Sequence, residues 1–259
     1  MLLVIDIGNS SITTGIFAGD RLLYRLEIPT RPQGDPGLYR GEFEKLLSGK
    51  NVEKPLNGVI ISSVVPELTD ALARSVKEIS MGEPLTVDCS LDTGLTFDVE
   101  RPEEIGADRI ANAVAALETF GSPVAVVDFG TATTISAVRD SRFLGGAILP
   151  GLRLMGGALH KGTAKLPAVD FVGKTGELVS SVAALGKNTT MCIISGIIFG
   201  TAGAVERIVR GIETEEGCGF KVVATGGYSP AVAGYMERKG FLEPDLTLRG
   251  LRLIYERNA

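Results

Sequence analysis

The chain has 259 residues, a formal net charge of −5 and no run of Lys or Arg, so neither nucleic acid nor an anionic membrane is expected as its main partner. With 44% hydrophobic and 22% charged residues, it can bury one large core or two medium ones. Its cysteines, Cys89, Cys192 and Cys218, are odd in number and lack C-x-x-C spacing, which argues against a disulfide framework or a structural zinc site. This cysteine usage is typical of the reducing cytoplasm.

Two apolar stretches could be mistaken for targeting or membrane segments. The first, at the N-terminus, follows no basic residues and is interrupted by Asp6, so it does not fit a signal peptide. The second, residues 191–205, contains three glycines and is shorter than the roughly 20 residues that span a bilayer. We therefore expect this second stretch to be a buried helix, and we expect no membrane partner.

Hydrophobic periodicity predicts that strands and helices alternate along the chain. In order, the predicted elements are a strand from residue 4, a β-rich run at 12–17, a proline- and glycine-rich loop at 29–41, a strand at 58–64, a helix at 67–79, a strand at 85–88, a helix at 107–119, a strand from 126 and a β-rich run at 134–138. Such alternation is typical of an α/β fold.

An internal repeat divides the sequence near its middle. Residues 4–11 (VIDIGNSS) align with residues 126–133 (VVDFGTAT), and each copy is an apolar strand that reaches Asp-x-Gly, a hydroxyl-rich turn and a second β-rich run. Duplication of one unit predicts two similar domains, 1–117 and 118–259, bridged by the helix at 107–119. Their two polar turns would then point into one nucleotide cleft.

The turn of the first copy carries the groups that Mg-ATP requires. Asp6 ends an apolar strand, Gly8 lets the backbone approach a phosphate, and the side chains of Asn9, Ser10 and Ser11 supply hydrogen-bond donors. A carboxylate can hold Mg²⁺ through water, while backbone and hydroxyl donors bind phosphate oxygens. The alternative is an ordinary hairpin that turns at Gly8 and Asn9.

The turn of the second copy repeats this design with threonines. Asp128 could bind a cation, and Thr131 could donate to a phosphate oxygen. The alternative is that the threonines simply favour a strand.

A third motif, Gly106-Ala107-Asp108-Arg109, opens the predicted bridging helix. In phosphoryl transfer, a carboxylate can accept the proton of the acceptor hydroxyl, and an arginine can pair with a substrate carboxylate. By itself, however, an Asp-Arg pair at a helix start is more often a solvated cap.

Other glycine-rich segments and the single histidine are less informative. Residues 145–151 and 224–228 are predicted to be turns after strands, suited to close approach by the substrate or by adenosine, although both could be structural. His160 is assigned no catalytic role. The sequence has neither a G-x-x-x-x-G-K-[ST] loop nor a protein-kinase signature.

Together these motifs resemble the type III pantothenate kinases, a family of the actin-like and hexokinase-like ATPase superfamily. The resemblance extends over nearly the whole chain. It is carried, in chain order, by residues 6–9 (DIGN), 62–66 (SSVVP), 106–109 (GADR), 128–133 (DFGTAT), 163–167 (TAKLP), 225–227 (TGG) and 246–251 (LTLRGL). It implies two duplicated actin-like (ribonuclease H-like) domains and ATP-dependent phosphorylation of pantothenate to 4'-phosphopantothenate, the first step of coenzyme A biosynthesis.

The resemblance also implies roles for individual residues. Asp108 would be the general base. The pantothenate site would comprise Gly106, Ala107, Asp108, Arg109 and Val99, with Thr189 reaching it from the other subunit of a homodimer. ATP would be bound by Asp6, Ile7, Gly8, Asn9, Ser10, Ser11, Ile12, Thr13, Thr131, Gly226 and Gly227. Asp6 would hold Mg²⁺ through water, and Asp128 would bind the monovalent cation, potassium or ammonium, that this family requires.

Three positions depart from the family pattern. The first turn has Ser10-Ser11 where Thr-Asn is usual, Val99 stands where many members have a tyrosine, and Ile194 replaces a frequent glutamine. Other hypotheses remain: a kinase of the same fold that acts on another small acid or a sugar, a non-catalytic ATP-binding regulatory paralogue, and an actin-like filament protein.

Overall fold

The computed structural model describes all residues except 32–38, 40, 42–55, 78–79, 173–177 and 180. The chain divides into two compact units, the first made of Met1–Ala115 with Leu246–Ala259 and the second of Ala116–Asp245. Two mixed sheets of five and six strands, covered by helices, confirm the predicted α/β class.

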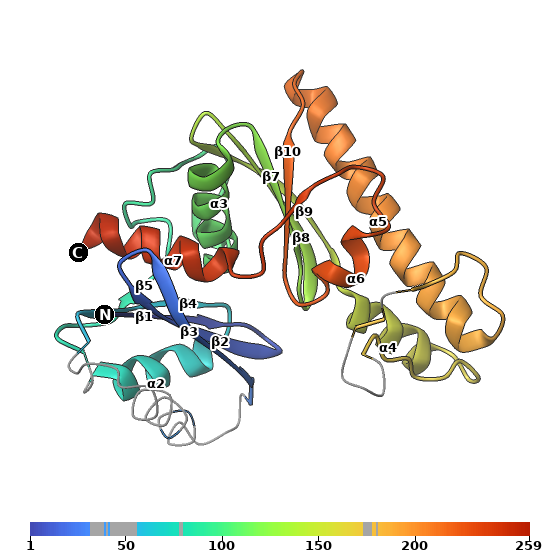
Figure 1. Ribbon diagram of the computed structural model, residues 1–259, viewed down its shortest axis with the longest axis horizontal. Helices are drawn as coiled ribbons and strands as arrows, with labels where there is room; N and C mark the ends of the chain where they lie inside the picture. Colours follow the sequence, from blue (N-terminus) through green and yellow to red (C-terminus); the bar gives the residue numbers. More distant parts are fainter. Residues whose placement is uncertain (32–38, 40, 42–55, 78–79, 173–177, 180) are drawn as a thin grey trace. The chain divides into compact units, whose positions relative to one another are not determined.

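The first unit contains a five-stranded sheet in the order β3-β2-β1-β4-β5 (Figure 1). Its elements are β1 (Leu2–Ile7), β2 (Ser11–Ala18), β3 (Arg21–Pro29), β4 (Gly58–Ser63), α2 (Pro66–Lys77), β5 (Leu85–Thr86), β6 (Thr96–Phe97), the 3-10 helix η1 (Pro102–Glu104), the start of α3 (Ala107–Phe120) and α7 (Leu246–Asn258). The first three strands are antiparallel to their neighbours, whereas β4 runs parallel to β1, and β5 runs parallel to β4.

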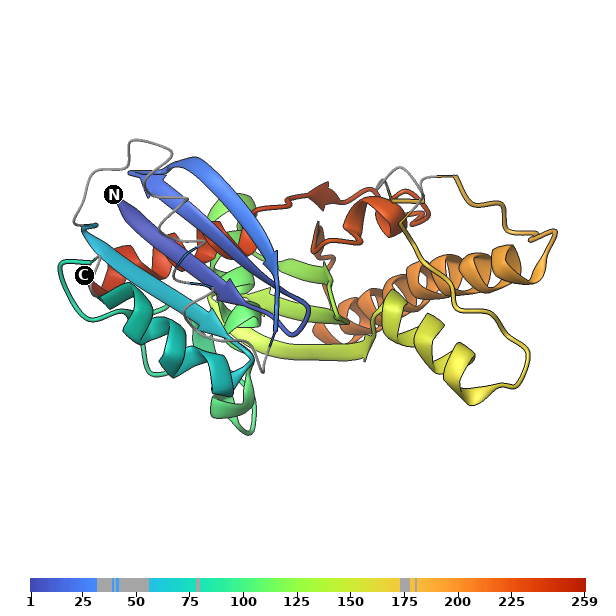
Figure 2. The same ribbon diagram turned by 90° about the horizontal axis from the view of Figure 1, so that it is seen from below.

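Helices cover both faces of this sheet, as Figures 1 and 2 show. The side chains of β1 alternate between the two faces, so Ile5 packs in the core that contains Leu72 of α2, and Val4 packs in the core that contains Leu251 of α7. Because both faces are buried, β1 is an almost continuous apolar run that only Asp6 interrupts.

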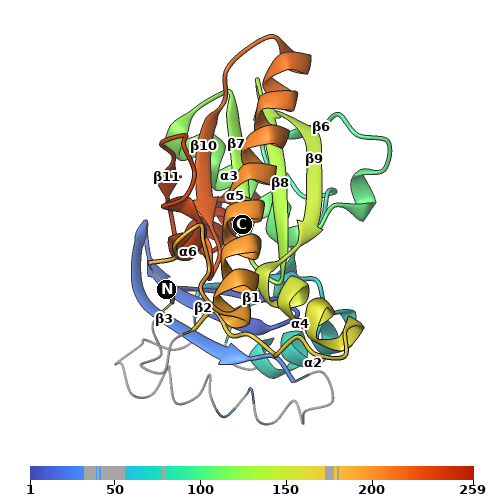
Figure 3. The ribbon, with the colours of Figure 1, turned by 90° about the vertical axis from the view of Figure 1, so that its right-hand side faces the viewer.

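The second unit repeats this arrangement. It contains five strands of the six-stranded sheet, in the order β11-β10-β7-β8-β9, and the long helix α5 runs along one face of these strands (Figure 3). The elements are β7 (Val124–Phe129), β8 (Ala132–Arg139), β9 (Arg142–Pro150), α4 (Leu152–Gly162), α5 (Thr189–Glu216), β10 (Lys221–Thr225), α6 (Ser229–Ala233) and β11 (Phe241–Leu242). Apolar residues of β7 and β8 share one core with α5.

The repeat predicted from the sequence extends to the strand register. Asp6 pairs with Thr13 on the antiparallel neighbour and with Ser62 on the parallel neighbour. Asp128 pairs in the same way with Thr134 and Thr225. In both units a register shift interrupts the pairing of the second and third strands. Each aspartate therefore occupies the same place in its unit, at the carboxyl end of a central strand.

Two features of the fold differ from the sequence prediction. The prediction assigned residues 118–259 to the second domain, but α7 contacts β1 and β4 and belongs to the first unit. Residues 145–150 lie inside β9, where a turn was predicted. Gly145 and Gly146 adopt φ of 110° and 153° beside the register shift, and a Cβ on Gly146 would collide with the carbonyl oxygen of Ile135. These glycines therefore serve strand pairing.

The apolar stretch at 191–205 is part of α5, as predicted, but the helix has 28 residues. By length and composition alone, α5 could cross a membrane, with a mean hydropathy of 1.6 over its most apolar window. However, 56% of that window is buried inside the protein, where Ile197, Ile198 and Val205 pack in the core of the second unit. The prediction of a buried core helix is confirmed.

Candidate active site

The first predicted phosphate turn is a tight reversal between β1 and β2. The backbone N–H of Gly8 donates to the carbonyl oxygen of Ser11 at 2.9 Å, which closes the turn. Asn9 and Ser10 are exposed at its tip. By contrast, the side chains of Ile7 and Ile12 are fully buried in the core, so these two residues can offer a ligand only their backbone.

Asp6 is held by a residue that sequence reasoning did not single out. The hydroxyl of Ser62, at the same level on the parallel strand β4, donates to Oδ1 of Asp6 at 2.8 Å. Ser62 is completely buried, so this hydrogen bond is shielded from water. Its only signal in the sequence was membership of the SSVVP motif, which by itself indicates no contact.

Asp108 lies in the first turn of α3 with its carboxylate folded back over Gly106. A Cβ on Gly106 would lie 2.5 Å from Oδ1 of Asp108, and the same oxygen accepts the backbone N–H of Arg109 at 2.8 Å. Burial raises the pKa of Asp108 above its ordinary value of 3.8, against the opposing effects of the Arg109 N–H and charge. Burial lowers the pKa of Arg109 below its ordinary value, and the negative charge of Asp108 opposes this decrease. The pair is thus partly desolvated rather than a solvated cap.

Asp108 and the first turn lie at the same edge of the first unit. Val64 follows β4 directly, and its backbone N–H donates to the carbonyl oxygen of Ile7 at 3.1 Å. A Cβ on Gly106 would lie 3.6 Å from a methyl group of the same Val64. The carboxyl ends of β1 and β4 therefore gather Asp6 and Asp108, as is usual for ligand sites of α/β sheets.

In the second unit, Asp128 lies one residue before the end of β7, close to two glycines. A Cβ on Gly130 would lie 3.2 Å from Oδ1 of Asp128, and a Cβ on Gly226 would collide with the same oxygen. Gly226 has a φ of 87° and follows β10, the parallel neighbour of β7. The sequence prediction of a turn at this position is confirmed, and the turn brings Gly226 against the Asp128 carboxylate.

Comparison with known proteins places the chain in a family. A family model described as type III pantothenate kinase matches residues 2–211. A type III pantothenate kinase of Moorella thermoacetica is 40% identical, and the alignment covers all of both chains. Another of Geobacillus thermodenitrificans is 38% identical over all of this chain and 98% of the relative.

The chain belongs to the type III pantothenate kinase family. Members of this family use ATP to phosphorylate pantothenate in coenzyme A biosynthesis, so the family resemblance seen in the sequence motifs is confirmed.

Solved structures show that the fold is that of actin-like ATPases. A Baf family transcriptional activator of Campylobacter jejuni superposes with a TM-score of 0.60 at 21% identity, covering 99% of this chain and 98% of the other. Component A of (R)-2-hydroxyglutaryl-CoA dehydratase from Acidaminococcus fermentans has a TM-score of 0.58 at 15% identity, covering 98% and 96%. At such identities the likeness concerns the fold alone.

Thr131 of the kinase lies beside a glycine that the site predictions did not include. The backbone N–H of Gly151 donates to the carbonyl oxygen of Thr131 at 3.2 Å, and a Cβ on Gly151 would collide with that oxygen. The second predicted phosphate turn is thus joined to the start of α4. Of the two glycines predicted to adjoin adenosine, Gly226 is half-buried and Gly227 is exposed.

Val99 and Thr189 are the remaining predicted site residues. Val99 is half-buried between β6 and η1, and Thr189 is the exposed first residue of α5. The side chain of Asn188 caps this helix by accepting the N–H of Met191 at 2.9 Å. Nδ1 of His160 lies 2.9 Å from the carbonyl oxygen of Leu166, a contact within the α4 region that suits a structural role.

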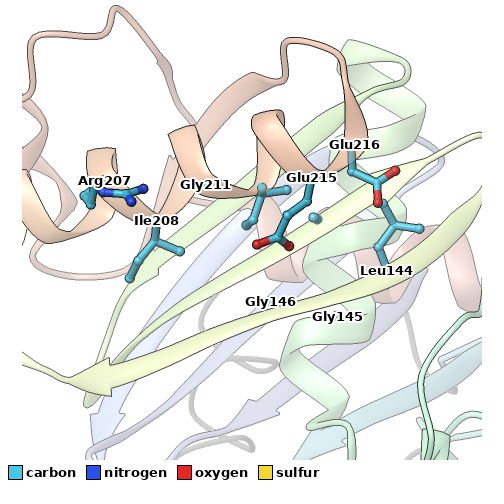
Figure 4. Close-up of a pocket in the computed structure, with 10 residues that line it drawn as sticks. Leu144, Gly145, Gly146, Arg207, Ile208, Gly211, Glu215 and Glu216 are labelled. Carbon is cyan, nitrogen blue, oxygen red and sulfur yellow. The ribbon is translucent and has the colours of Figure 1, made fainter.

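A shallow pocket of about 630 Å³ lies between α5 and β9 (Figure 4). Gly145 and Gly146 form part of its wall, and Arg207, Glu215 and Glu216 line it from the helix. Gly145 and Ala137, which line the pocket, pair with each other, and Ala137 pairs with Ala125 near the amino end of β7, whereas Asp128 lies near its carboxyl end. We therefore exclude this pocket from the candidate site.

Among the residues that the structure describes, no three His, Cys, Asp or Glu side chains cluster closely enough to hold a metal ion by themselves. A carboxylate such as Asp6 or Asp128 suits a different kind of cation site, in which substrate phosphates, water or backbone carbonyls complete the coordination.

Proposed function

We propose that this chain transfers the terminal phosphoryl group of ATP to the 4'-hydroxyl of pantothenate, with Asp108 as the general base. The observation that carries this proposal is the Asp108 carboxylate, partly buried and folded over Gly106 beside Arg109. Burial raises the pKa of Asp108, which makes the ionised carboxylate a better acceptor for the hydroxyl proton.

Arg109 would bind the carboxylate of pantothenate. A guanidinium can form two parallel hydrogen bonds with a carboxylate, and partial burial strengthens them. The backbone of Gly106 and Ala107 would line the same pocket, with Val99 at its side. An acidic acceptor suits this arrangement better than a neutral sugar does.

The first turn would bind Mg-ATP. Asp6 would hold Mg²⁺ through water, and the Gly8 turn with Asn9, Ser10, Ser11 and Thr13 would bind the phosphates. The fit is supported by the Asp6 carboxylate at the strand end, oriented by Ser62, and by the exposed tip of the turn. When bound, Mg²⁺ would neutralise charge on the phosphates.

The second turn would bind a monovalent cation and more of ATP. We propose that Asp128 holds potassium or ammonium, that Thr131 donates to a phosphate and that Gly226 and Gly227 adjoin adenosine. The glycines on both sides of the Asp128 carboxylate support this assignment, because they let backbone approach the carboxylate closely enough for carbonyl oxygens to share an ion with it.

We also propose that the kinase is a cytoplasmic homodimer in which Thr189 serves the pantothenate site of the other subunit. The exposure of Thr189 at the start of α5 supports this. Thr189→Ala should weaken pantothenate binding and leave the dimer intact. Unaltered pantothenate affinity in a titration would remove Thr189 from the site.

The decisive experiment measures ADP release from Mg-ATP with and without pantothenate, in potassium and then in sodium buffer. Pantothenate-dependent release that requires potassium would support the acceptor and the cation together. Asp108→Asn should reduce turnover by roughly 10² to 10⁴ while ATP binding persists. Release with another small acid or a sugar would change the acceptor. ATP binding without release under any condition would favour a regulatory protein.

A further inference from the structure

Thr30, just beyond β3, makes two hydrogen bonds to the first phosphate turn. Its hydroxyl donates to the carbonyl oxygen of Gly8 at 2.6 Å, and its backbone N–H donates to the carbonyl oxygen of Ser10 at 3.1 Å. The two carbonyls lie on either side of Asn9 in the turn. Thr30 belongs to none of the sequence motifs, and it lies at least twenty positions along the chain from the residues that it contacts.

These bonds control which backbone groups the turn presents. A carbonyl oxygen that pointed outward would repel the oxygens of a phosphate, and Thr30 draws both carbonyls toward itself. In a trans peptide the N–H points opposite to the C=O, and the only cis bond among the described residues is Ser122-Pro123. The N–H of Asn9 therefore points away from Thr30, where it can serve an anion.

Thr30 is itself held from the core. The hydroxyl of Tyr39 accepts the backbone N–H of Arg31 at 2.8 Å and donates to the Arg31 carbonyl oxygen at 3.2 Å. Tyr39 is only 4% exposed and packs in the same core as Ile7 and Ile12, the residues that flank the turn. The turn and its support are thus both anchored in the core of the first unit.

We propose that Thr30 is a positioning residue for ATP, holding the first turn in the conformation that presents its donors to the phosphates. This inference rests on the proposed nucleotide-binding role of the turn. Thr30 does not contact the reacting atoms, so its loss should weaken binding of ATP and spare binding of the acceptor.

The test compares Thr30→Val, which removes the hydroxyl and keeps the shape, with Thr30→Ser, which keeps the hydroxyl. Thr30→Val should raise the KM for ATP by roughly 3- to 10-fold, the effect of losing one neutral hydrogen bond, and leave the KM for pantothenate unchanged. Thr30→Ser should restore most of the ATP affinity. Thr214→Val is the matched control, because its hydroxyl donates to the Arg210 carbonyl oxygen within α5 and contacts no phosphate turn.

Binding of Mg-ATP to the full-length protein, measured by calorimetry without acceptor, separates this inference from the proposed function. If the natural protein binds ATP but does not phosphorylate pantothenate, the proposed acceptor is wrong and the comparison of Thr30 variants still stands. Tyr39→Phe gives a second perturbation should Thr30→Val fail to fold, and it should weaken ATP binding in the same direction. Natural ATP affinity in both Thr30→Val and Tyr39→Phe, or equal loss of both substrates, would overturn the inference.

Discussion

Replacing Gly106 with alanine should displace the proposed general base without disturbing the backbone. Gly106 is not among the glycines with positive φ, so alanine can adopt its conformation. The added Cβ would lie 3.6 Å from a methyl group of Val64, an ordinary contact, but only 2.5 Å from Oδ1 of Asp108. The one steric conflict is therefore with the carboxylate.

The size of this conflict sets the expected effect. A Cβ contact under 3.0 Å essentially never occurs, so the Asp108 oxygen must move, by at least roughly 0.9 Å to reach an ordinary contact. Misplacement of a catalytic group by about 1 Å can cost about 10²-fold in rate. We expect Gly106→Ala to lower kcat by roughly 10- to 100-fold, which is less than complete loss of the base.

The assay is pantothenate-dependent ADP release, with the KM for ATP and the melting temperature measured on the same sample. The KM for ATP and the melting temperature should both stay near those of the natural protein, because the substitution leaves the proposed ATP-binding turn unchanged. Gly157→Ala, in α4, is the control, since its Cβ would meet no atom within 4 Å. Natural turnover in Gly106→Ala would refute the idea that the Asp108 rotamer depends on the missing Cβ.

Three further substitutions test the surrounding geometry. Ser62→Ala should raise the Mg²⁺ concentration for half-maximal activity by at least roughly tenfold, because hydrogen bonds to charged groups contribute about 1.5–3 kcal/mol. The control Ser63→Ala loses contacts only within its own loop and α2, so it should lower stability instead. Gly226→Ala should destabilise the protein by about 1–3 kcal/mol and weaken potassium activation, because Gly226 has a φ of 87° and the added Cβ would collide with Asp128. The control Gly227→Ala should leave stability unchanged in thermal melts. Asp108→Asn should raise the melting temperature at neutral pH, because the raised pKa of Asp108 means that its ionised form destabilises the folded state. This gain in melting temperature should vanish below pH 3.8, the ordinary pKa, where the carboxyl is protonated in both the folded and the unfolded state.

Each of these expectations has a contrary outcome. Equal Mg²⁺ dependence of the two serine variants would show that the buried hydroxyl does not orient Asp6. Full potassium activation in Gly226→Ala would move the cation site away from Asp128. A melting temperature of Asp108→Asn that is lower than the natural one at neutral pH would mean that the carboxylate stabilises the fold.

The sequence alone determined the α/β class, the duplication and the family. These features are local or repeated: apolar runs have a recognisable period, and the Asp-x-Gly turn occurs twice. It also determined that Asp6 and Asp128 would occupy equivalent strand ends, because a repeated unit folds in a repeated register. The short motif at residues 106–109 predicted the candidate general base without reference to any tertiary contact.

Only the tertiary structure decided which distant residues support the site. The pairing of β1 with β4 places Ser62 at Asp6, and the path of β3 brings Thr30 to the first turn, although neither contact follows from local pattern. The structure also shows that α7 belongs to the first unit and that Gly145 lies in a strand. In each case the physical reason is the same: burial and hydrogen bonding join segments far apart in the chain, and periodicity describes only neighbours in sequence.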